Sequence, residues 1–310
     1  MAEGGQALLA LAAMAVLLSA AGAAFPERVF VGAVDQDLHA NESCLVGNGA
    51  GRYASQVRLA RVPLLESKGP CYARYVGAQL YRGETYYLQL DSHMTMVPRW
   101  DEVLIDQARL AGPHACLSTY PPDVAIYGTN AAAEPYTLCE SYWNERGLLV
   151  FRASVPLPPR PTPRLIGFAA AGFMFCPATI LADVPFDPDL PMLFSGEEIL
   201  YTARLWTSGY DVYALGSNVV FHLYSGASST RPKFWEDQPD YFPTMIRSEE
   251  KVKYLLGLHP ARPTGAIIQP RHGLGAERPL EAFWRHVHVD PTSQTAASGA
   301  HFCPEHQGPW

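Results

Sequence analysis

The residues best suited to chemistry stand at the end of a short apolar stretch. Residues 86–90 (YYLQL) have the pattern of a strand, and Asp91, Ser92 and His93 follow directly. In open α/β sheets, ligands bind beyond the carboxyl ends of the strands. A carboxylate and an imidazole offer one oxygen and one nitrogen ligand, which suits an ion such as Mn²⁺ better than Ca²⁺. The pair indicates a metal site, but two ligands do not define one, and Asp91 could equally cap a turn beside a surface histidine.

Two further positions could contribute to such a site. His222 ends the apolar run 219–222, where an isolated histidine also fits a core or surface role. Glu197 and Glu198 open an expected helix, and the helix dipole alone favours acids in a first turn. Adjacent helical residues face different directions, so at most one of the two would usually reach a substrate. The functional interpretation is a carboxylate that holds sugar hydroxyls.

Several other function classes lack their signatures. The sequence contains no GxSxG elbow, P-loop, HExxH, or GxGxxG after a strand. With 23 Lys and Arg against 30 Asp and Glu, the net charge of −7 argues against a broad nucleic-acid surface and allows only a local phosphate pocket. The hydrophobic share of 48% excludes a disordered chain. None of the six cysteines forms a CxxC pair, so buried thiols and one or two disulfides both remain open.

The elements that would position these residues alternate along the first half of the chain. Such alternation predicts an α/β domain with a largely parallel sheet. The expected strands cover residues 28–34, 55–62, 86–90, 172–176, 212–214 and 219–222, and the expected helices cover 69–81, 100–110 and 197–206. The Pro-rich stretch 156–163 reads as a surface loop or divider. The polar tail from residue 294 is expected to be poorly ordered.

The N-terminus carries an uncharged apolar run over residues 7–24. Small residues at positions 21–24 offer an A-x-A-like cleavage site, so a secretory signal peptide is the first interpretation. An uncleaved membrane anchor is the second, because the run approaches the length of a membrane span. No Lys or Arg precedes the run, and an Ala-rich disordered start is the third interpretation. The sequon at Asn41 fits a secreted chain.

Longer blocks of sequence carry a family pattern over residues 28–290. The blocks are GPCYARY, YYLQLDSHMTMVPRWDE, AAAGFMF, FSGEEILYTARLWTSGYDVY, VVFHLYS, RPKFWE and GLGAERPLE. Their combination resembles the eukaryotic polypeptide N-acetylglucosaminyltransferases, which glycosylate hydroxyproline or Thr. The DSH motif, the Gly-Glu helix start and the later His are similar, more distantly, to the polypeptide GalNAc transferases.

The resemblance implies a GT-A fold over residues 25–292, which is a nucleotide-sugar-binding α/β sandwich with a mixed, mostly parallel central sheet. By their composition, residues 1–24 are expected to be a signal peptide or anchor, and residues 293–310 a disordered polar tail. The implied activity is a retaining, metal-dependent transfer of GlcNAc from UDP-GlcNAc to a Thr, Ser or hydroxyproline hydroxyl of a polypeptide. The partners would be this acceptor, the UDP-sugar and Mn²⁺ or Mg²⁺, with no nucleic acid and a possible membrane anchor through residues 7–24.

The resemblance also implies roles for single residues. The implied metal ligands are Asp91, His93 and His222. The residues implied near donor sugar and acceptor are Glu197 and Glu198. The residues implied to contact the donor are Val31 and Gln36 at the uridine, Arg74 on the nucleotide side, Gly172 at the sugar and Arg231 at the pyrophosphate.

Two features depart from the family pattern. Residues 226–230 carry little charge where phosphate contacts are expected. The N-terminal apolar run is absent from the cytoplasmic hydroxyproline enzyme, which favours a mucin-type role in the ER or Golgi lumen over a cytoplasmic one. An inactive or lectin-like GT-A domain is the alternative function, and a metal-dependent hydrolase is a third. The full set of Asp91, His93, Glu197 and His222 argues against the former, and the lack of a carboxylate motif near Asp91 against the latter.

Overall fold

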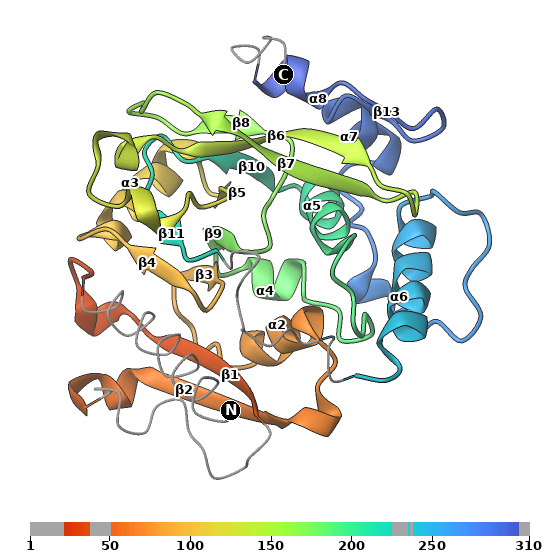
Figure 1. Cartoon of the computed structure of the whole chain (residues 1–310), viewed down its shortest axis with the longest axis horizontal. Coiled ribbons are helices and arrows are strands. Elements are labelled where there is room, and N and C mark those ends of the chain that lie inside the picture. The colour runs from red at the N-terminus through yellow and green to blue at the C-terminus, as the bar shows by residue number, and fades with distance from the viewer. Residues whose placement is uncertain (1–21, 38–50, 225–234, 236–237, 304–310) are drawn as a thin grey trace.

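The computed structural model describes residues 22–37, 51–224, 235 and 238–303 of the chain (Figure 1). The strands are β1 (Val31–Asp37), β2 (Val57–Pro63), β3 (Tyr86–Leu90), β4 (Met94–Met96), β5 (Ala115–Ser118), β6 (Tyr136–Trp143), β7 (Leu149–Pro156), β8 (Arg164–Ile166), β9 (Phe173–Pro177), β10 (Asp211–Ala214), β11 (Val220–His222), β12 (Val289–Asp290) and β13 (Thr295–Ala296). The α-helices are α2 (Pro70–Ala78), α3 (Trp100–Ala111), α4 (Ile180–Asp183), α5 (Glu197–Thr207), α6 (Tyr241–Leu255), α7 (Leu280–His286) and α8 (Ser298–Phe302). Short 3₁₀ turns cover Pro26–Arg28, Gly51–Gln56, Leu64–Glu66, Val124–Ile126, Asn130–Ala133 and Pro270–His272.

The central sheet is mixed, with the strand order β3-β9-β5-β10-β8. Only β5 and β10 pair in parallel, while β9 lies antiparallel between β3 and β5, and β8 lies antiparallel on β10. The predicted α/β fold with a mixed central sheet is confirmed, but antiparallel pairs outnumber parallel ones, so the expectation that the sheet would be mostly parallel was wrong. Strand β9 was predicted correctly as a strand, but an apolar run looks the same in either direction and so does not reveal its orientation.

Side chains on both faces of this sheet are buried. Successive residues of a strand point to opposite faces, and β9 shows this at Phe173 and Met174. Met174 packs into a cluster that includes residues of α5 and α7, whereas Phe173 packs into a second cluster with α3, β4 and β11. Packing on both faces holds the sheet in place. The ends of its strands are not covered in this way, and they form the site.

A separate parallel pair, β1 with β2, lies on one side of the molecule, and α2 packs against β1 (Figure 1). Gly77 of α2 makes this packing close, because a Cβ there would already lie 3.4 Å from Cγ2 of Val34. In Figure 1, α2 lies between this pair and the central part of the fold.

The C-terminal tail differs from its sequence-based expectation. Strand β13 pairs with β12, and α8 packs against β6, so residues 295–302 belong to the folded structure, where disorder was expected from residue 293. A disulfide between Cys139 of β6 and Cys303 holds this segment. Contacts of this kind join distant parts of the chain, and a polar tail composition does not reveal them.

A second disulfide joins Cys116 of β5 to Cys176 of β9, while Cys71 is a buried thiol. Cys44 and the sequon at Asn41 fall outside the described residues, as does the predicted leader up to residue 21. Across the part of the chain that the structure describes, no helix combines the length and the apolar character needed to cross a bilayer.

Candidate functional site

Asp91 stands at the carboxyl end of β3, as the sequence pattern predicts. Its backbone N–H donates a 3.1 Å hydrogen bond to the carbonyl of Gly172, the residue before β9. The carboxylate lies over this glycine, because a Cβ at Gly172 would be only 3.0 Å from Oδ2 of Asp91. The Asp91 side chain is 44% exposed, so the carboxylate can reach a ligand from solvent. Because Gly172 has no side chain, the Asp91 carboxylate can lie directly against it.

His93 and His222 come together through the pairing of two short strands. Strand β11 lies antiparallel to β4, with His222 opposite Met94, and the N–H of Leu223 donates to the carbonyl of His93 over 2.9 Å. The two imidazole rings are edge to face with centroids 5.8 Å apart. One cation can contact a nitrogen of each ring at this separation, because metal–nitrogen distances are about 2.1 Å.

Arg74 connects the metal candidates to the first turn of α5. Its guanidinium, on α2, forms an ion pair with Glu197 and lies 3.5 Å from Oδ1 of Asp91. Burial alone would lower the pKa of Arg74, but Glu197 and Asp91 raise it, so the guanidinium stays charged. Arg74 therefore orients two carboxylates that come from elements far apart in the sequence.

Glu198 forms hydrogen bonds with different residues from those that contact Glu197. Its carboxylate accepts hydrogen bonds from the Tyr120 hydroxyl (2.5 Å) and from the backbone N–H of Ala171 (2.9 Å). Burial raises the pKa of Glu198 to about 7, against these two hydrogen bonds, which lower it. Burial and the nearby Glu198 raise the pKa of Tyr120, so its hydroxyl remains a donor. Glu198 can thus change its protonation state near neutral pH.

The start of α5 places both acids by means of one glycine. Gly196 has a left-handed backbone (φ 99°), and a Cβ there would lie 3.2 Å from Leu148 and 3.3 Å from Val252. Only glycine combines this conformation with this space without strain. The helix dipole then favours the two carboxylates in the first turn of α5.

The other residues implied to contact the donor have fewer links to the group formed by Asp91, Arg74 and Glu197. Val31 starts β1 and Gln36 stands near its end, roughly 16 Å further along the strand. Gln36 accepts a hydrogen bond from Ser67, which lies shortly before α2, the helix that carries Arg74. Val31 is at the opposite end, and Arg231 lies outside the described residues.

Sequence reasoning missed Tyr120 as a member of this site. It follows β5, whose direction in the sheet is the same as that of β3, because both strands are antiparallel to β9. Their carboxyl ends lie at the same edge of the sheet, and the ligand rule for strand ends points to residues after Ser118 as well as after Leu90. The position of Tyr120 just after β5 was therefore the feature of the sequence that could have identified it.

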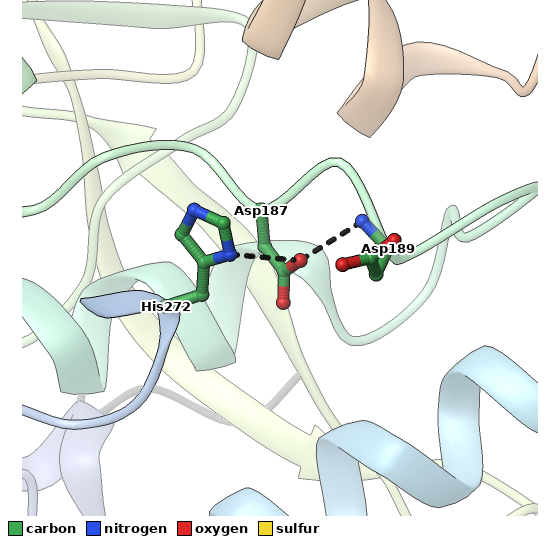
Figure 2. Close-up of side chains that lie close together, drawn as sticks. All are labelled: Asp187, Asp189 and His272. Carbon is green, nitrogen blue, oxygen red and sulfur yellow. Dashed lines mark hydrogen bonds and ion pairs between the residues drawn. The ribbon is translucent and has the colours of Figure 1, made fainter. Parts of the chain in front are cut away.

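A second polar group could also hold a cation. Asp187, Asp189 and His272 offer ligand atoms within 4.8 Å of one another, and Figure 2 shows Asp187 between the other two. However, the Lys251 ammonium lies 2.7 Å from Oδ2 of Asp187 and donates to the Asp189 carbonyl. A divalent ion would add to this existing positive charge. The group instead ties the loop before α5 to α6, and no motif in the sequence pointed to it.

Asp91, His93 and His222 differ from this group in ligand type and in nearby charge. They offer a carboxylate and two imidazoles, the mixed oxygen and nitrogen set that Mn²⁺ and related ions accept. The carboxylate is accessible, and its only described cationic neighbour, Arg74, is 3.5 Å away and is also bound to Glu197. Asp91, His93 and His222 therefore remain candidate metal ligands beside the group of Asp187, Asp189 and His272.

Comparison with solved structures places the fold among GT-A glycosyltransferases. GalNAc-T7, solved with UDP, GalNAc and Mn²⁺, superposes with a TM-score of 0.52 at 17% identity. The match covers 87% of this chain and 51% of the other, so this chain spans about half the length of GalNAc-T7. TarS 1–349 of S. aureus in complex with UDP-GlcNAc gives a TM-score of 0.44 at 16% identity, covering 83% of this chain and 64% of that one.

Comparison of sequences identifies the family. No curated protein matches the chain significantly. The profile of the family described as Glycosyltransferase (GlcNAc) matches residues 48–293, which includes all the site residues discussed above except Val31 and Gln36. Because that match covers most of the 310 residues, the chain belongs to the GlcNAc glycosyltransferase family.

Proposed function

We propose that this glycosyltransferase moves GlcNAc from UDP-GlcNAc to a hydroxyl group of a polypeptide, with retention, using a divalent cation held by Asp91, His93 and His222. The observation that supports the proposal is the edge-to-face pair of His93 and His222, with ring centroids 5.8 Å apart, together with the contacts of Arg74 to Asp91 and to Glu197 in the first turn of α5. The family description names GlcNAc, and GalNAc-T7 supports a UDP-sugar with Mn²⁺.

The protein's own residues supply orientation and charge. A bound divalent cation would stabilise the negative charge of the departing diphosphate. Arg74 is paired closely with Glu197 and more loosely with Asp91, which lowers the reorganisation needed when a donor binds. Gly172 allows the chain to approach the donor sugar without a side chain. Ionised Glu198 can accept a hydrogen bond from a sugar hydroxyl. We assign no catalytic base.

The acceptor and the compartment form the finer part of the proposal. The sequence blocks that resemble the polypeptide N-acetylglucosaminyltransferases support a Thr, Ser or hydroxyproline acceptor. The apolar run over residues 7–24 and two disulfides support folding in the secretory pathway, because disulfides persist mainly in oxidising compartments. Arg231 remains a candidate for the pyrophosphate, and Gln36 for the uridine.

The test is release of UDP from UDP-GlcNAc by the purified full chain, with and without Mn²⁺ and with Thr, Ser or hydroxyproline peptides. We expect release that depends on both metal and peptide, with GlcNAc found on the peptide by mass spectrometry. Binding of UDP-GlcNAc without release, at any peptide and metal concentration tested, would indicate the lectin-like alternative. Faster release from UDP-GalNAc than from UDP-GlcNAc would correct the donor but not the reaction.

A further inference from the structure

The first residues that the structure describes are held by a buried carboxylate. Asp101, the second residue of α3, is only 7% exposed. Its Oδ1 accepts the backbone N–H of Ala24 over 2.6 Å, and its Oδ2 accepts the N–H of Phe25 over 3.1 Å. The helix dipole accounts for an acid in this turn. It does not account for both oxygens being directed at the backbone of residues 24 and 25.

The buried carboxylate has no positively charged partner in the described part of the chain. No described Lys, Arg or His forms an ion pair with Asp101, and neighbouring Arg99 pairs with Glu102 instead. Buried charges in proteins are usually paired with an opposite charge. A positive group at the nitrogen of Ala24 would complete this arrangement.

A cleavage site in the sequence would create such a positively charged group. Ala24 directly follows Ala21-Gly22-Ala23, the small-residue pattern of a leader cleavage site, at the end of the apolar run. We propose that the chain is processed between Ala23 and Ala24, and that Asp101 binds the α-ammonium group that processing creates. A leader peptidase would use water to break the C–N bond between the two residues. Ala23 would retain the new carboxylate, and Ala24 would gain the amine, which binds a further proton.

Cleavage at this position would remove few of the interactions made by residues 22–24. Cleavage removes one backbone hydrogen bond, from the N–H of Arg99 to the carbonyl of Gly22 (2.7 Å), and the burial of the small Ala23 side chain. It converts the 2.6 Å bond at Ala24 into a charge-assisted one, and such bonds are about twice as strong as neutral ones. The inference rests on the secretory routing proposed above, but not on the glycosyl-transfer chemistry.

The first experiment determines the N-terminus of the full chain after expression through a eukaryotic secretory pathway. Terminal sequencing and intact mass are expected to give Ala24 as the first residue. A chain that begins at Met1 or at Gly22 would overturn the proposal. Transfer activity is measured on the same sample, so that failure of processing and failure of the proposed function are seen separately.

The second experiment measures how strongly the new amine is protected. The processed protein is treated with an amine-acylating reagent across pH 7–10, and the modification of the Ala24 amine is followed by peptide mapping. An ion pair raises the amine pKa above its usual value of about 7.7–8.0, and each unit of increase slows acylation near neutral pH by about tenfold. Wild-type protein should therefore react at least about tenfold more slowly than a short peptide with the same N-terminal sequence.

Variants assign the protection to Asp101. Asp101→Asn keeps the size of the side chain but removes its charge, and the Ala24 amine should then react like the peptide. Glu102→Gln, the adjacent half-buried acid on the same turn, is the matched control and should leave protection unchanged. Equal rates for wild type and peptide would overturn the proposal, and this comparison does not require that the Asp101 variant folds.

Discussion

The Tyr120 hydroxyl donates a 2.5 Å hydrogen bond to Oε2 of Glu198, and this contact joins the end of β5 to the first turn of α5. Because hydrogen bonding favours the ionised form, the contact opposes the effect of burial, which raises the pKa of Glu198 to about 7. The ionised fraction of Glu198 at neutral pH therefore depends on Tyr120.

This relationship predicts a shift in the pH profile of transfer. If ionised Glu198 accepts a bond from the sugar, kcat/KM should fall below about pH 7 in the wild type. Tyr120→Phe removes an interaction that lowers the pKa, so the acidic limb should move to higher pH. Tyr127→Phe is the control, because its ring packs on Phe221 outside the Glu198 group. Identical profiles for wild type and Tyr120→Phe would contradict this role.

The same pKa predicts how stability varies with pH. The folded-state pKa of Glu198, about 7, lies above its ordinary value of 4.5, so the folded state retains this proton where the unfolded state loses it. The contribution of Glu198 is fully present below pH 4.5 and is lost as the pH rises to about 7. The shift corresponds to roughly 3 kcal/mol at most. Urea unfolding from pH 4.5 to 8 should show this loss in wild type and a smaller loss in Glu198→Gln.

The sequence predicted those parts of the fold that depend on local patterns. The strand at 86–90 and the helix that starts at Trp100 were placed with the bounds or start that the structure gives. The direction of β9 was not predictable, since an apolar run packs equally well in parallel or antiparallel pairing. The β6–β7 hairpin and α6 were not expected at all, because no sharp turn or cap signal was recognised around them.

The site was predictable only in part, for a similar reason. Asp91 and His93 are neighbours in sequence and mark the end of a strand, so their closeness is a local property. The ion pair between Arg74 and Glu197 spans 123 residues, and the bond from Tyr120 to Glu198 spans 78. Such pairings follow from how α2, β5 and α5 pack together, and spacing within one segment contains no information about that.

The Cys139–Cys303 disulfide predicts a stability that depends on oxidation. Peptide mapping without reductant should recover Cys139 linked to Cys303, Cys116 linked to Cys176, and Cys71 as a thiol. Cys303→Ser should lower the free energy of unfolding by about 2–5 kcal/mol, since the closed loop is long. In excess reductant, wild type and variant should be nearly equal, which is the internal control. A full-sized difference in reductant would assign the loss to packing of α8 instead.

The approach of Gly172 to Asp91 predicts a selective effect on metal use. In Gly172→Ala, the new Cβ would lie 3.0 Å from Oδ2 of Asp91 and push the carboxylate away. The Mn²⁺ concentration for half-maximal UDP release should rise on the order of tenfold, or about 1.4 kcal/mol. Gly77→Ala in α2 is the matched control, because its Cβ would meet Val34 at an ordinary distance of 3.4 Å. An unchanged Mn²⁺ requirement in Gly172→Ala would show that Asp91 is not held against this glycine during turnover.

The charge of Asp91 predicts the clearest separation of function from folding. Asp91→Asn keeps the shape of the side chain and its backbone bond to Gly172, but it removes the charge that attracts a divalent ion. The rate of UDP release should fall by roughly a hundredfold or more, because the cation offsets the charge of the leaving diphosphate. The melting temperature without metal should barely change, since the lost ion pair to Arg74 is long, at 3.5 Å, and partly exposed.

His93→Ala should lose activity as well but regain part of it at high Mn²⁺, because a neutral ligand contributes less to the charge balance. Asp106→Asn, an exposed acid paired with Arg109, is the control and should change neither property. Full activity in Asp91→Asn, or a loss that its melting curve explains entirely, would reject Asp91 as a metal ligand.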